Sequence, residues 1–397
     1  MLKYAKNPGN CPPGKGMRAC ENTKDASCGL KWLICEVTQV KEPNPIYLKL
    51  LKIILWTYII LCFIIAGLNY GYAAKAPQNI AKMITWVWLI YENWIKTLFI
   101  LAGSFLTLKI VGSSKRTKMR KRNLIGLIIA TLAVHIAGPI LLNNYELYFY
   151  AMPLPWTTTP LQLLDTSSPF YHSTVAAWGP SGVVTALIFF AAISVIIFIG
   201  TLLWGRRFQC STICLFNGFA AEVFAPAMPL LGKQKKLKPR TLAVLYVLRW
   251  LFLAIALFFV CCWILYLLGF AISGNIDVIT KIETYKYLAG ELLMMMFFWI
   301  EVTGRGYCYF CPLGTSLSLL ALIAGQKITT DNTRCIKCNK CNDACPMSID
   351  IRTKAVDGIS VRDIKCVGCG HCVDACPTQN LEYSTRFIET VTKKRVK

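Results

Sequence analysis

A cysteine pattern that occurs twice near the end of the sequence limits what this chain can fold into more than any other feature. Residues 335–345 and 366–376 both read Cys-x2-Cys-x2-Cys-x3-Cys, and a proline follows each run. Steps of three residues place three thiolates around one face of a metal cluster, with the fourth cysteine displaced from them. Zinc motifs rarely use two such quartets in tandem. The pattern therefore predicts two [4Fe–4S] clusters.

These runs predict a C-terminal α+β module of the bacterial 2[4Fe–4S] ferredoxin type. In two-cluster ferredoxins the fourth cysteine of each run binds the other cluster. The first cluster is thus assigned to Cys335, Cys338, Cys341 and Cys376. The second is assigned to Cys366, Cys369, Cys372 and Cys345. Between the runs, segments 349–351 and 359–361 flank Asp357-Gly358, which predicts a β-hairpin.

Six apolar stretches precede the module, and a helix needs roughly 20 such residues to cross a bilayer. They lie at 48–68, 84–108, 124–142, 183–204, 242–270 and 287–303. Only 16% of residues are charged, against about 25% in soluble domains. We expect a membrane all-α bundle of about six transmembrane helices. The expected domains are an N-terminal segment (1–47), a transmembrane domain (48–325), the ferredoxin domain (326–384) and a basic tail (385–397).

The connecting loops predict the orientation. Loops 109–123 and 205–240 each hold seven Lys or Arg residues, whereas the loops on the other side share Lys75, Lys82, Lys281 and Lys286. Because basic loops stay on the cytoplasmic side, both termini and the ferredoxin domain are expected in the cytoplasm, at an inner membrane. The same bias accounts for the net charge of +23 without a nucleic-acid partner. The first ten residues lack an apolar segment, so no cleavable signal peptide is expected.

Two Gly-Arg/Cys motifs follow the fourth and sixth apolar stretches. The first contains Arg206, Cys210 and Cys214, and the second contains Arg305, Cys308 and Cys311. Shorter apolar stretches, 215–231 and 313–325, follow them as two expected half-helices. The four cysteines and the two arginines are the predicted cofactor-binding residues. The four thiols are expected either to bind one further cluster or to form a redox disulfide. The alternative is that the cysteines stay reduced and the arginines anchor the chain at the membrane surface.

Together these features resemble the membrane iron–sulfur family that includes the NapH-type quinol dehydrogenases, with NosR-type and CcoG-type proteins as relatives. The resemblance covers about residues 50–380. The paired motif of that family is usually Cys-x3-Cys-Pro. Here Leu215 stands where the first proline is expected, and the second pair is one residue closer. The resemblance implies electron transfer with the quinone pool, in a complex with other redox subunits.

Four more cysteines, Cys11, Cys20, Cys28 and Cys35, precede the first span in a loop-rich segment. They are predicted to bind a metal, because a small segment with little hydrophobic core needs a bound metal or a cross-link to hold its fold. A third [4Fe–4S] cluster, a [2Fe–2S] cluster, zinc and free thiols all stay open. One or two additional clusters are therefore expected beyond the two of the ferredoxin domain.

Ionisable residues within apolar stretches are functional candidates, since burying them in a bilayer is costly. His135 lies near the middle of the third stretch, and Glu92 and Lys96 are one i,i+4 step apart in the second. These three are the predicted catalytic residues, which would bind a quinone oxygen or carry its proton. Glu222, Glu291 and Glu301 are further candidates, with Glu301 as a neutralising partner of Arg305. Arg249 is expected to reach the cytoplasmic face.

Three functions are compatible with these features. The first is a membrane-bound oxidoreductase subunit that passes electrons between the quinone pool and a redox partner. The alternative is a membrane reductase that supports maturation of a metalloenzyme. The third is a docking scaffold with structural clusters. Only His135 of the three histidines lies in a span, which disfavours a bis-histidine haem.

Overall fold

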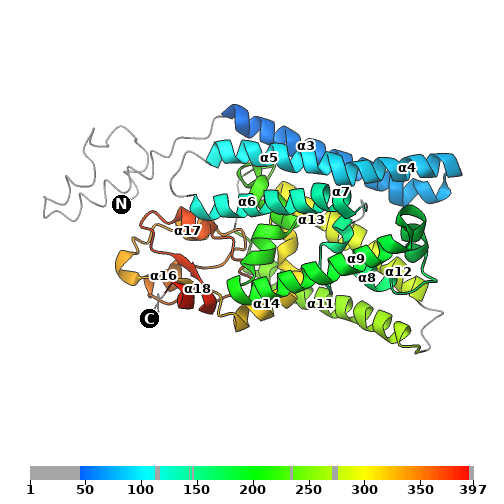
Figure 1. Ribbon diagram of the computed structural model, residues 1–397. Helices are drawn as coiled ribbons and strands as arrows, with labels where there is room; N and C mark the ends of the chain where they lie inside the picture. Colours follow the sequence, from blue (N-terminus) through cyan, green and yellow to red (C-terminus); the bar gives the residue numbers. More distant parts are fainter. Residues whose placement is uncertain are drawn as a thin grey trace, which may run out of the picture.

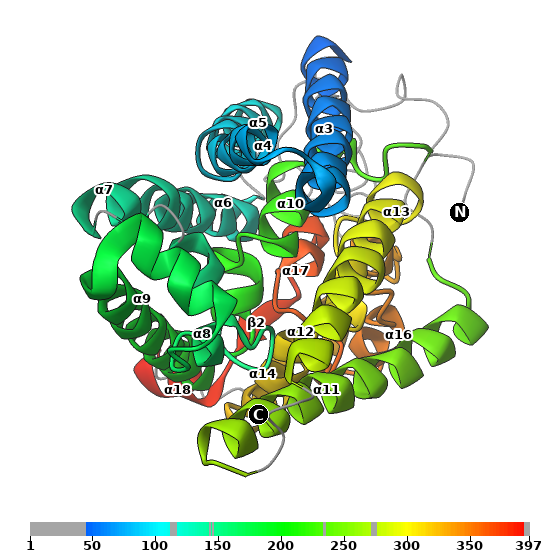
Figure 2. The same ribbon diagram turned by 90° about the vertical axis from the view of Figure 1, so that its right-hand side faces the viewer.

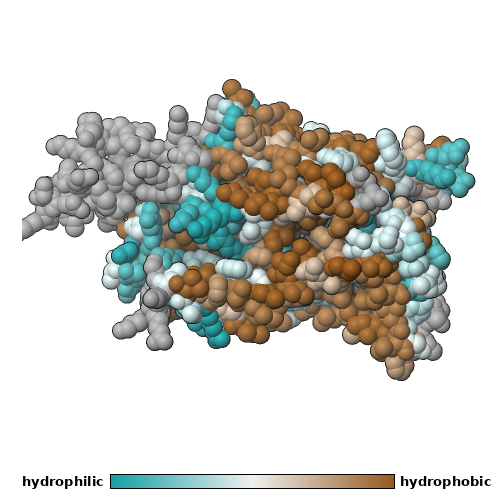
Figure 3. Space-filling view, viewed as in Figure 1, coloured by the Kyte–Doolittle hydropathy of each residue, from teal (hydrophilic) through white to brown (hydrophobic). Residues whose placement is uncertain are grey.

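The computed structural model describes residues 45–111, 117–142, 144, 147–232, 236–270 and 276–392. Long helices run side by side across one part of the molecule, and a small domain with short helices and strands lies at one end (Figure 1). Viewed from the other end, the long helices surround a central space, behind which the small domain is seen (Figure 2). A brown apolar band lies between two more hydrophilic ends (Figure 3).

Among the described residues, four helices are long and apolar enough to cross a membrane. The helical stretches are Pro45–Tyr72 (beginning with α3, Pro45–Ala66), Lys118–Leu142 (α6, Lys118–Leu132, to α7, Gly138–Leu142), Phe170–Trp204 (in α9, Pro169–Trp204) and Pro239–Leu267 (α11). They correspond to four of the six predicted spans. Helix α9 bends at Gly179, which has a φ of 72° just before Pro180, because proline cannot donate to the preceding helical turn.

The other two predicted spans are interrupted. Residues 84–108 lie in α4 (Gln78–Ile90), a π-helical segment (Tyr91–Ile95) and α5 (Lys96–Val111). Residues 287–303 lie mainly in a π-helical segment (Lys286–Leu293) and α13 (Met294–Glu301), which follow α12 (Ile276–Tyr285). Both interruptions carry charged residues, Glu92 in the first and Glu291 in the second.

The expected half-helices are two short apolar helices after the Gly-Arg/Cys motifs. Helix α10 covers Asn217–Val223, and α14 covers Pro312–Ile323. Every residue of α10 is buried, so its backbone is enclosed by protein rather than by lipid. This placement is how irregular backbone is tolerated at membrane depth.

The small domain has a two-stranded antiparallel sheet in which β1 (Lys327–Thr329) pairs with β2 (Glu382–Ser384). Its helices are α15 (Lys340–Asp343), α16 (Arg352–Val356), α17 (His371–Ala375) and α18 (Arg386–Val391). The predicted hairpin of 349–351 with 359–361 is wrong. Asn342 Oδ1 accepts the backbone N–H groups of Ile351 and Arg352 at 2.7 and 2.9 Å, which starts α16 instead.

Candidate functional site

The first predicted cluster position is a cysteine-lined cavity at the outer side of the small domain. Cys335, Cys338, Cys341 and Cys376 all line it, although Cys376 comes from the other cysteine run. The exchange of the fourth cysteine that the spacing predicts is therefore present in the fold. Cys338 is exposed, so this position is open to solvent.

The second predicted position gathers the remaining four cysteines of the domain. Burial raises the pKa of the Cys345 thiol to about 11. Burial also raises the pKa of Cys372, and the neighbouring Cys369, Cys345 and Cys366 add to that effect. Crowded buried thiols are costly to ionise unless a cation compensates them, so this donor set fits an iron–sulfur cluster.

Among the described residues no three Cys, His, Asp or Glu side chains meet at one point as ligands of a single metal ion. A cubane cluster has no such requirement, because each of its four thiolates binds a different iron atom.

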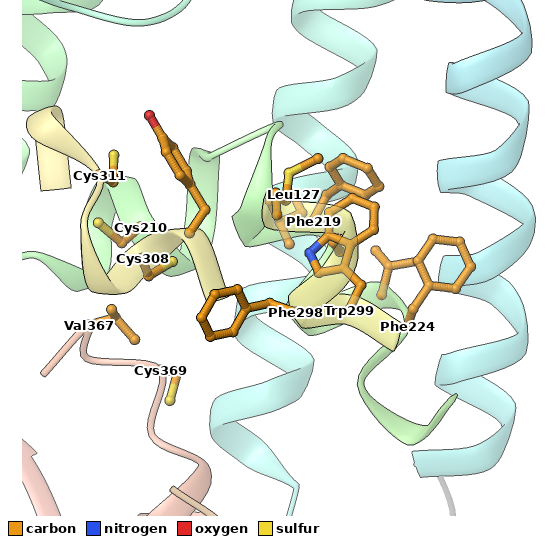
Figure 4. Close-up of a cluster of buried hydrophobic side chains, with 14 of the residues drawn as sticks. Leu127, Cys210, Phe219, Phe224, Phe298, Trp299, Cys308, Cys311, Val367 and Cys369 are labelled. Atoms are coloured by element: carbon orange, nitrogen blue, oxygen red, sulfur yellow. The ribbon is translucent and has the colours of Figure 1, made fainter. Parts of the chain in front are cut away.

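The two Gly-Arg/Cys motifs bring their four cysteines into one group, in which Cys214 is half-buried and the other three are buried. Cys210, Cys308 and Cys311 lie close together, and Cys369 of the small domain lies just below them (Figure 4). Burial, together with the neighbouring Cys210 and Cys308, raises the pKa of Cys214 to about 11. Cys311 interacts in the same way with the other three thiols. We call Cys210, Cys214, Cys308 and Cys311 the four-cysteine site.

Both arginines of the motifs lie inside this site rather than at a membrane surface. Arg206 and Arg305 are 1% and 0% exposed. Arg206 donates from Nε to Cys210 Sγ at 3.2 Å, and Arg305 donates from Nη1 to the Cys210 carbonyl. The interpretation of these arginines as surface anchors is wrong. Two fixed positive charges beside four thiols favour their ionised, metal-binding form.

A buried carboxylate balances this charge. Glu222, on α10, pairs with Arg305 Nη2 and also lies 3.0 Å from His371 Nε2 of the small domain. Burial alone would raise the pKa of Glu222, but His371 and Arg305 lower it to about 2. Glu301 is exposed, so the expectation that it neutralises Arg305 is wrong. His371 stands between two cluster cysteines in the sequence, which is the signal that could have identified it.

The loop that carries the second cysteine run docks against the long helices. Asn123 Nδ2 donates to the Cys369 carbonyl at 2.8 Å, and Ser211 Oγ donates to the Val367 carbonyl at 3.0 Å. Arg249 Nη2 donates to the Ile364 carbonyl at 3.0 Å and is fully buried. Arg249 thus extends to the iron–sulfur domain, as a long side chain that reaches the expected cytoplasmic side would, but its guanidinium is buried there rather than in solvent. The second cluster position thus lies next to the four-cysteine site.

The junction also depends on Gly205, at the end of α9. Its φ is 72°, and a Cβ there would lie 2.5 Å from Tyr383 Oη and 2.6 Å from Gln326 Oε1. Gly205→Ala is expected to cost about 1–3 kcal/mol of stability from the backbone alone and to loosen the small domain. Thermal unfolding and limited proteolysis would measure both effects. Gly71→Ala is the matched control, since no atom lies within 4 Å of its added Cβ. Equal behaviour of the two variants would contradict this role.

A second candidate site is a cavity of about 940 Å³ between the long helices. Its lining includes all three predicted catalytic residues, Glu92, Lys96 and His135. At its inner end it reaches Ile213 and Phe216, which flank Cys214.

Five π-helical segments contribute to this lining. They are Gly67–Tyr72, Tyr91–Ile95, Ala133–Ala137, Phe208–Ile213 and Lys286–Leu293. The lining residues on them are Tyr70, Glu92, Val134, His135, Ile213, Lys286 and Glu291. A π-helical turn inserts one residue into a helix, and such turns occur frequently at functional sites. The interruptions of the predicted spans thus converge on one place.

Two ion pairs lie at the cavity. Lys96 Nζ is 2.7 Å from Glu92 Oε2, and Lys286 Nζ is 3.0 Å from Glu291 Oε1. The first pair is the i,i+4 pair expected from the sequence. Glu92 and Glu291 are 7% and 1% exposed, so neither lies at a membrane surface. His135 is buried, and its ring stacks on Tyr148 with the ring centroids 5.9 Å apart. Within the part of the chain that the structure describes, its Nδ1 has no hydrogen-bond partner.

The cavity and the four-cysteine site are separated by aromatic side chains. The ring centroid of Phe216 lies 5.8 Å from that of Trp156, which lines the cavity. It lies 5.3 Å from the ring centroid of Tyr307, the residue before Cys308. Tyr307 in turn lies beside Glu291. The cavity therefore ends directly against the residues that carry the thiols.

Cys11, Cys20, Cys28 and Cys35 lie outside the described residues, so their predicted metal stays a prediction. In the expected basic tail (385–397), residues 386–391 form α18, which packs against α9 with the ring centroids of Phe387 and Trp204 5.6 Å apart.

Comparison with known proteins assigns the small domain. Residues 327–389 match the 4Fe-4S dicluster domain family. The chain therefore carries an iron–sulfur domain with an electron-transfer role at its C-terminal end, joined to helices that are long and apolar enough for a membrane.

Two relatives come from Methanocaldococcus jannaschii, and both are described as uncharacterized proteins. The first is 30% identical over 165 residues, which cover 40% of this chain and 66% of the relative. The second is 33% identical over 90 residues, which cover 22% of this chain and 32% of the relative. The matches thus span less than two thirds of either relative. No solved structure matches the chain.

Proposed function

We propose that this protein is a membrane-bound electron-transfer subunit that exchanges electrons between a quinone and a redox partner. The observation that carries the proposal is the continuous arrangement of the cavity, the four-cysteine site and the two cluster positions. Each is adjacent to the next through named contacts, from Phe216 to Tyr307 and from Ser211 to Val367. Iron–sulfur clusters, when bound, would supply one-electron transfer at the three cysteine groups.

The chain's own residues define the order. The cavity would hold the quinone ring among aromatic side chains, with His135 and the Glu92–Lys96 pair beside its oxygens. The four-cysteine site is enclosed in protein, which keeps water from it. The second cysteine quartet of the iron–sulfur domain follows, and the first, with its exposed Cys338, faces solvent. A partner protein would therefore dock over Cys335, Cys338 and Cys341.

In this proposal the chain spans the membrane about six times, with the iron–sulfur domain in the cytoplasm. The two remaining helical runs, α4 to α5 and α12 to α13, supply the spans beyond the four long apolar helices. The family resemblance to the NapH-type quinol dehydrogenases supports the choice of a quinone, and the basic loops support the orientation.

Quinone binding can be tested without turnover. Trp88, Trp156 and Trp263 line the cavity, so a soluble quinone analogue is expected to quench tryptophan fluorescence of the detergent-purified protein. His135→Ala is expected to weaken binding about tenfold, because a buried hydrogen bond is worth about 1–1.5 kcal/mol. His172→Ala is the control, since His172 is exposed on α9. Quenching that is absent, or equally weakened by both variants, would contradict a quinone in this cavity.

A further inference from the structure

The cavity has a polar mouth at the end away from the iron–sulfur domain. Among its lining residues Ser167, Lys281 and Thr284 are exposed. They come from the segment before α9 and from α12, and α12 lies at the opposite end of the molecule from α16, α17 and α18 (Figure 1). The inner end, by contrast, is closed by Phe216 and Ile213 against the four-cysteine site.

Acidic residues line the cavity from its buried part to this mouth. Glu291 is 1% exposed and lies within electrostatic reach of Glu283, one helical segment earlier. Glu283 is half-buried and accepts hydrogen bonds from Thr158, at 3.1 Å from its backbone N–H. Asp165, which accepts from Tyr266 Oη at 3.2 Å, also lines the mouth.

The two ion pairs place a carboxylate beside an ammonium group at two points of the cavity wall. Glu92–Lys96 and Glu291–Lys286 come from different helical runs, which lie on separate sides of the central space (Figure 2). Carboxylates from two helical runs therefore line the cavity.

We propose that Glu291 and Glu283 form a proton path from the quinone to the face opposite the iron–sulfur domain. This inference rests on the proposed function. When a quinol is oxidised, its two O–H bonds break and its two ring oxygens become carbonyls. Two electrons pass singly towards the cysteine groups and on to a one-electron acceptor on the domain's side. The two protons leave through the mouth, or enter there when a quinone is reduced. Electrons and protons thus part at opposite ends of one cavity, and each turnover separates charge across the membrane.

The test uses the full chain in liposomes that contain a trapped pH dye. Duroquinol is the donor, and ferricyanide, which does not cross the membrane, is added outside. Only molecules whose iron–sulfur domain faces outwards can reduce it. We expect about two protons inside the vesicle for every two ferricyanide ions reduced, abolished by an uncoupler. Protein-free vesicles correct for direct reaction of the two reagents.

Release of both protons outside, at an unchanged rate of ferricyanide reduction, would overturn the proton path and leave the proposed function standing. Quinol-driven reduction that is absent, while dithionite-reduced protein still reduces ferricyanide, would overturn the proposed function and this path with it.

A variant measurement identifies the residue. Glu291→Gln keeps the shape of the side chain but removes its proton affinity, so inside acidification and ferricyanide reduction are expected to slow at least about tenfold together. Quinone-analogue binding, followed by tryptophan fluorescence, should stay within about twofold. Glu301→Gln is the matched control, because Glu301 ends the next helix, α13, and is exposed outside the cavity. Unchanged acidification in Glu291→Gln would exclude Glu291 from the path.

Discussion

Cys210→Ser is expected to remove about four iron atoms per chain and the [4Fe–4S] signal that goes with them. The four thiols of the four-cysteine site lie together, and Arg206 donates directly to Cys210 Sγ at 3.2 Å. Serine offers a harder, less acidic ligand at the same place, so a cluster there would lose one of four thiolates. Electron transfer from quinol to ferricyanide should fall to its background rate. The iron–sulfur domain itself should keep about eight iron atoms.

Iron and sulfide analysis, with EPR of the dithionite-reduced protein, would measure the change. Cys261→Ser is the matched control, because Cys261 lies on α11 outside the three cysteine groups and is exposed. Unchanged iron together with lost electron transfer would show that the four thiols act without a cluster, as a thiol or disulfide pair. Unchanged values for both would remove the four-cysteine site from the electron path altogether.

The parts of the fold that were predictable are those that local sequence determines. The spacing of the cysteines within the two runs was enough to predict an iron–sulfur domain, and the match to the dicluster domain agrees with that prediction. The apolar stretches at 48–68, 124–142, 183–204 and 242–270 are helices because each can bury or present an apolar surface along its whole length. The Lys96–Glu92 pair followed from i,i+4 geometry alone.

The errors concern contacts between distant segments. The hairpin prediction treated two short apolar runs as strands, whereas Asn342 and Asp350 bind the start of α16. The strands that actually pair are 327–329 and 382–384. The residues of either segment alone do not indicate its partner, which is more than 50 residues away in the sequence. Arg249 looked like a surface residue, but its partners are Ser318 on α14 and the Ile364 carbonyl.

The cavity was predictable only in part. His135, Glu92 and Lys96 stood out because charged groups are costly within apolar stretches. The π-helical turns that aim them inwards depend on packing against neighbouring helices, which a single sequence does not show. The second ion pair was missed because Lys286 lay at the expected edge of a span, where a lysine needs no buried partner.

Glu222→Gln is expected to lower the free energy of unfolding by about 3 kcal/mol, at the lower end of the cost of breaking a buried ion pair. Glu222 and Arg305 are both fully buried, and without the carboxylate the guanidinium loses its ion-pair partner and keeps neutral acceptors such as the Cys210 carbonyl and Ser211 Oγ. Denaturant or thermal unfolding of the detergent-purified protein would measure the loss. Glu301→Gln, which changes an exposed glutamate, should be within about 0.5 kcal/mol of the parent.

The position of Glu222 predicts more than a loss of stability, because it joins three segments that are far apart in the sequence. It holds Arg305 of the second Gly-Arg/Cys motif and His371 of α17, and α17 also caps α6 through Asp374, which accepts from the Met119 and Arg120 N–H groups at 3.1 and 3.0 Å. The iron–sulfur domain should therefore become easier to cleave from the long helices by a protease in Glu222→Gln.

The double variant Glu222→Gln/Arg305→Met, which removes both charges, should regain much of the stability. If it is instead as unstable as the single variant, the unpaired charge is not the cause. The loss then comes from the broken His371 contact, and electron transfer between the four-cysteine site and the domain should fall equally in both variants.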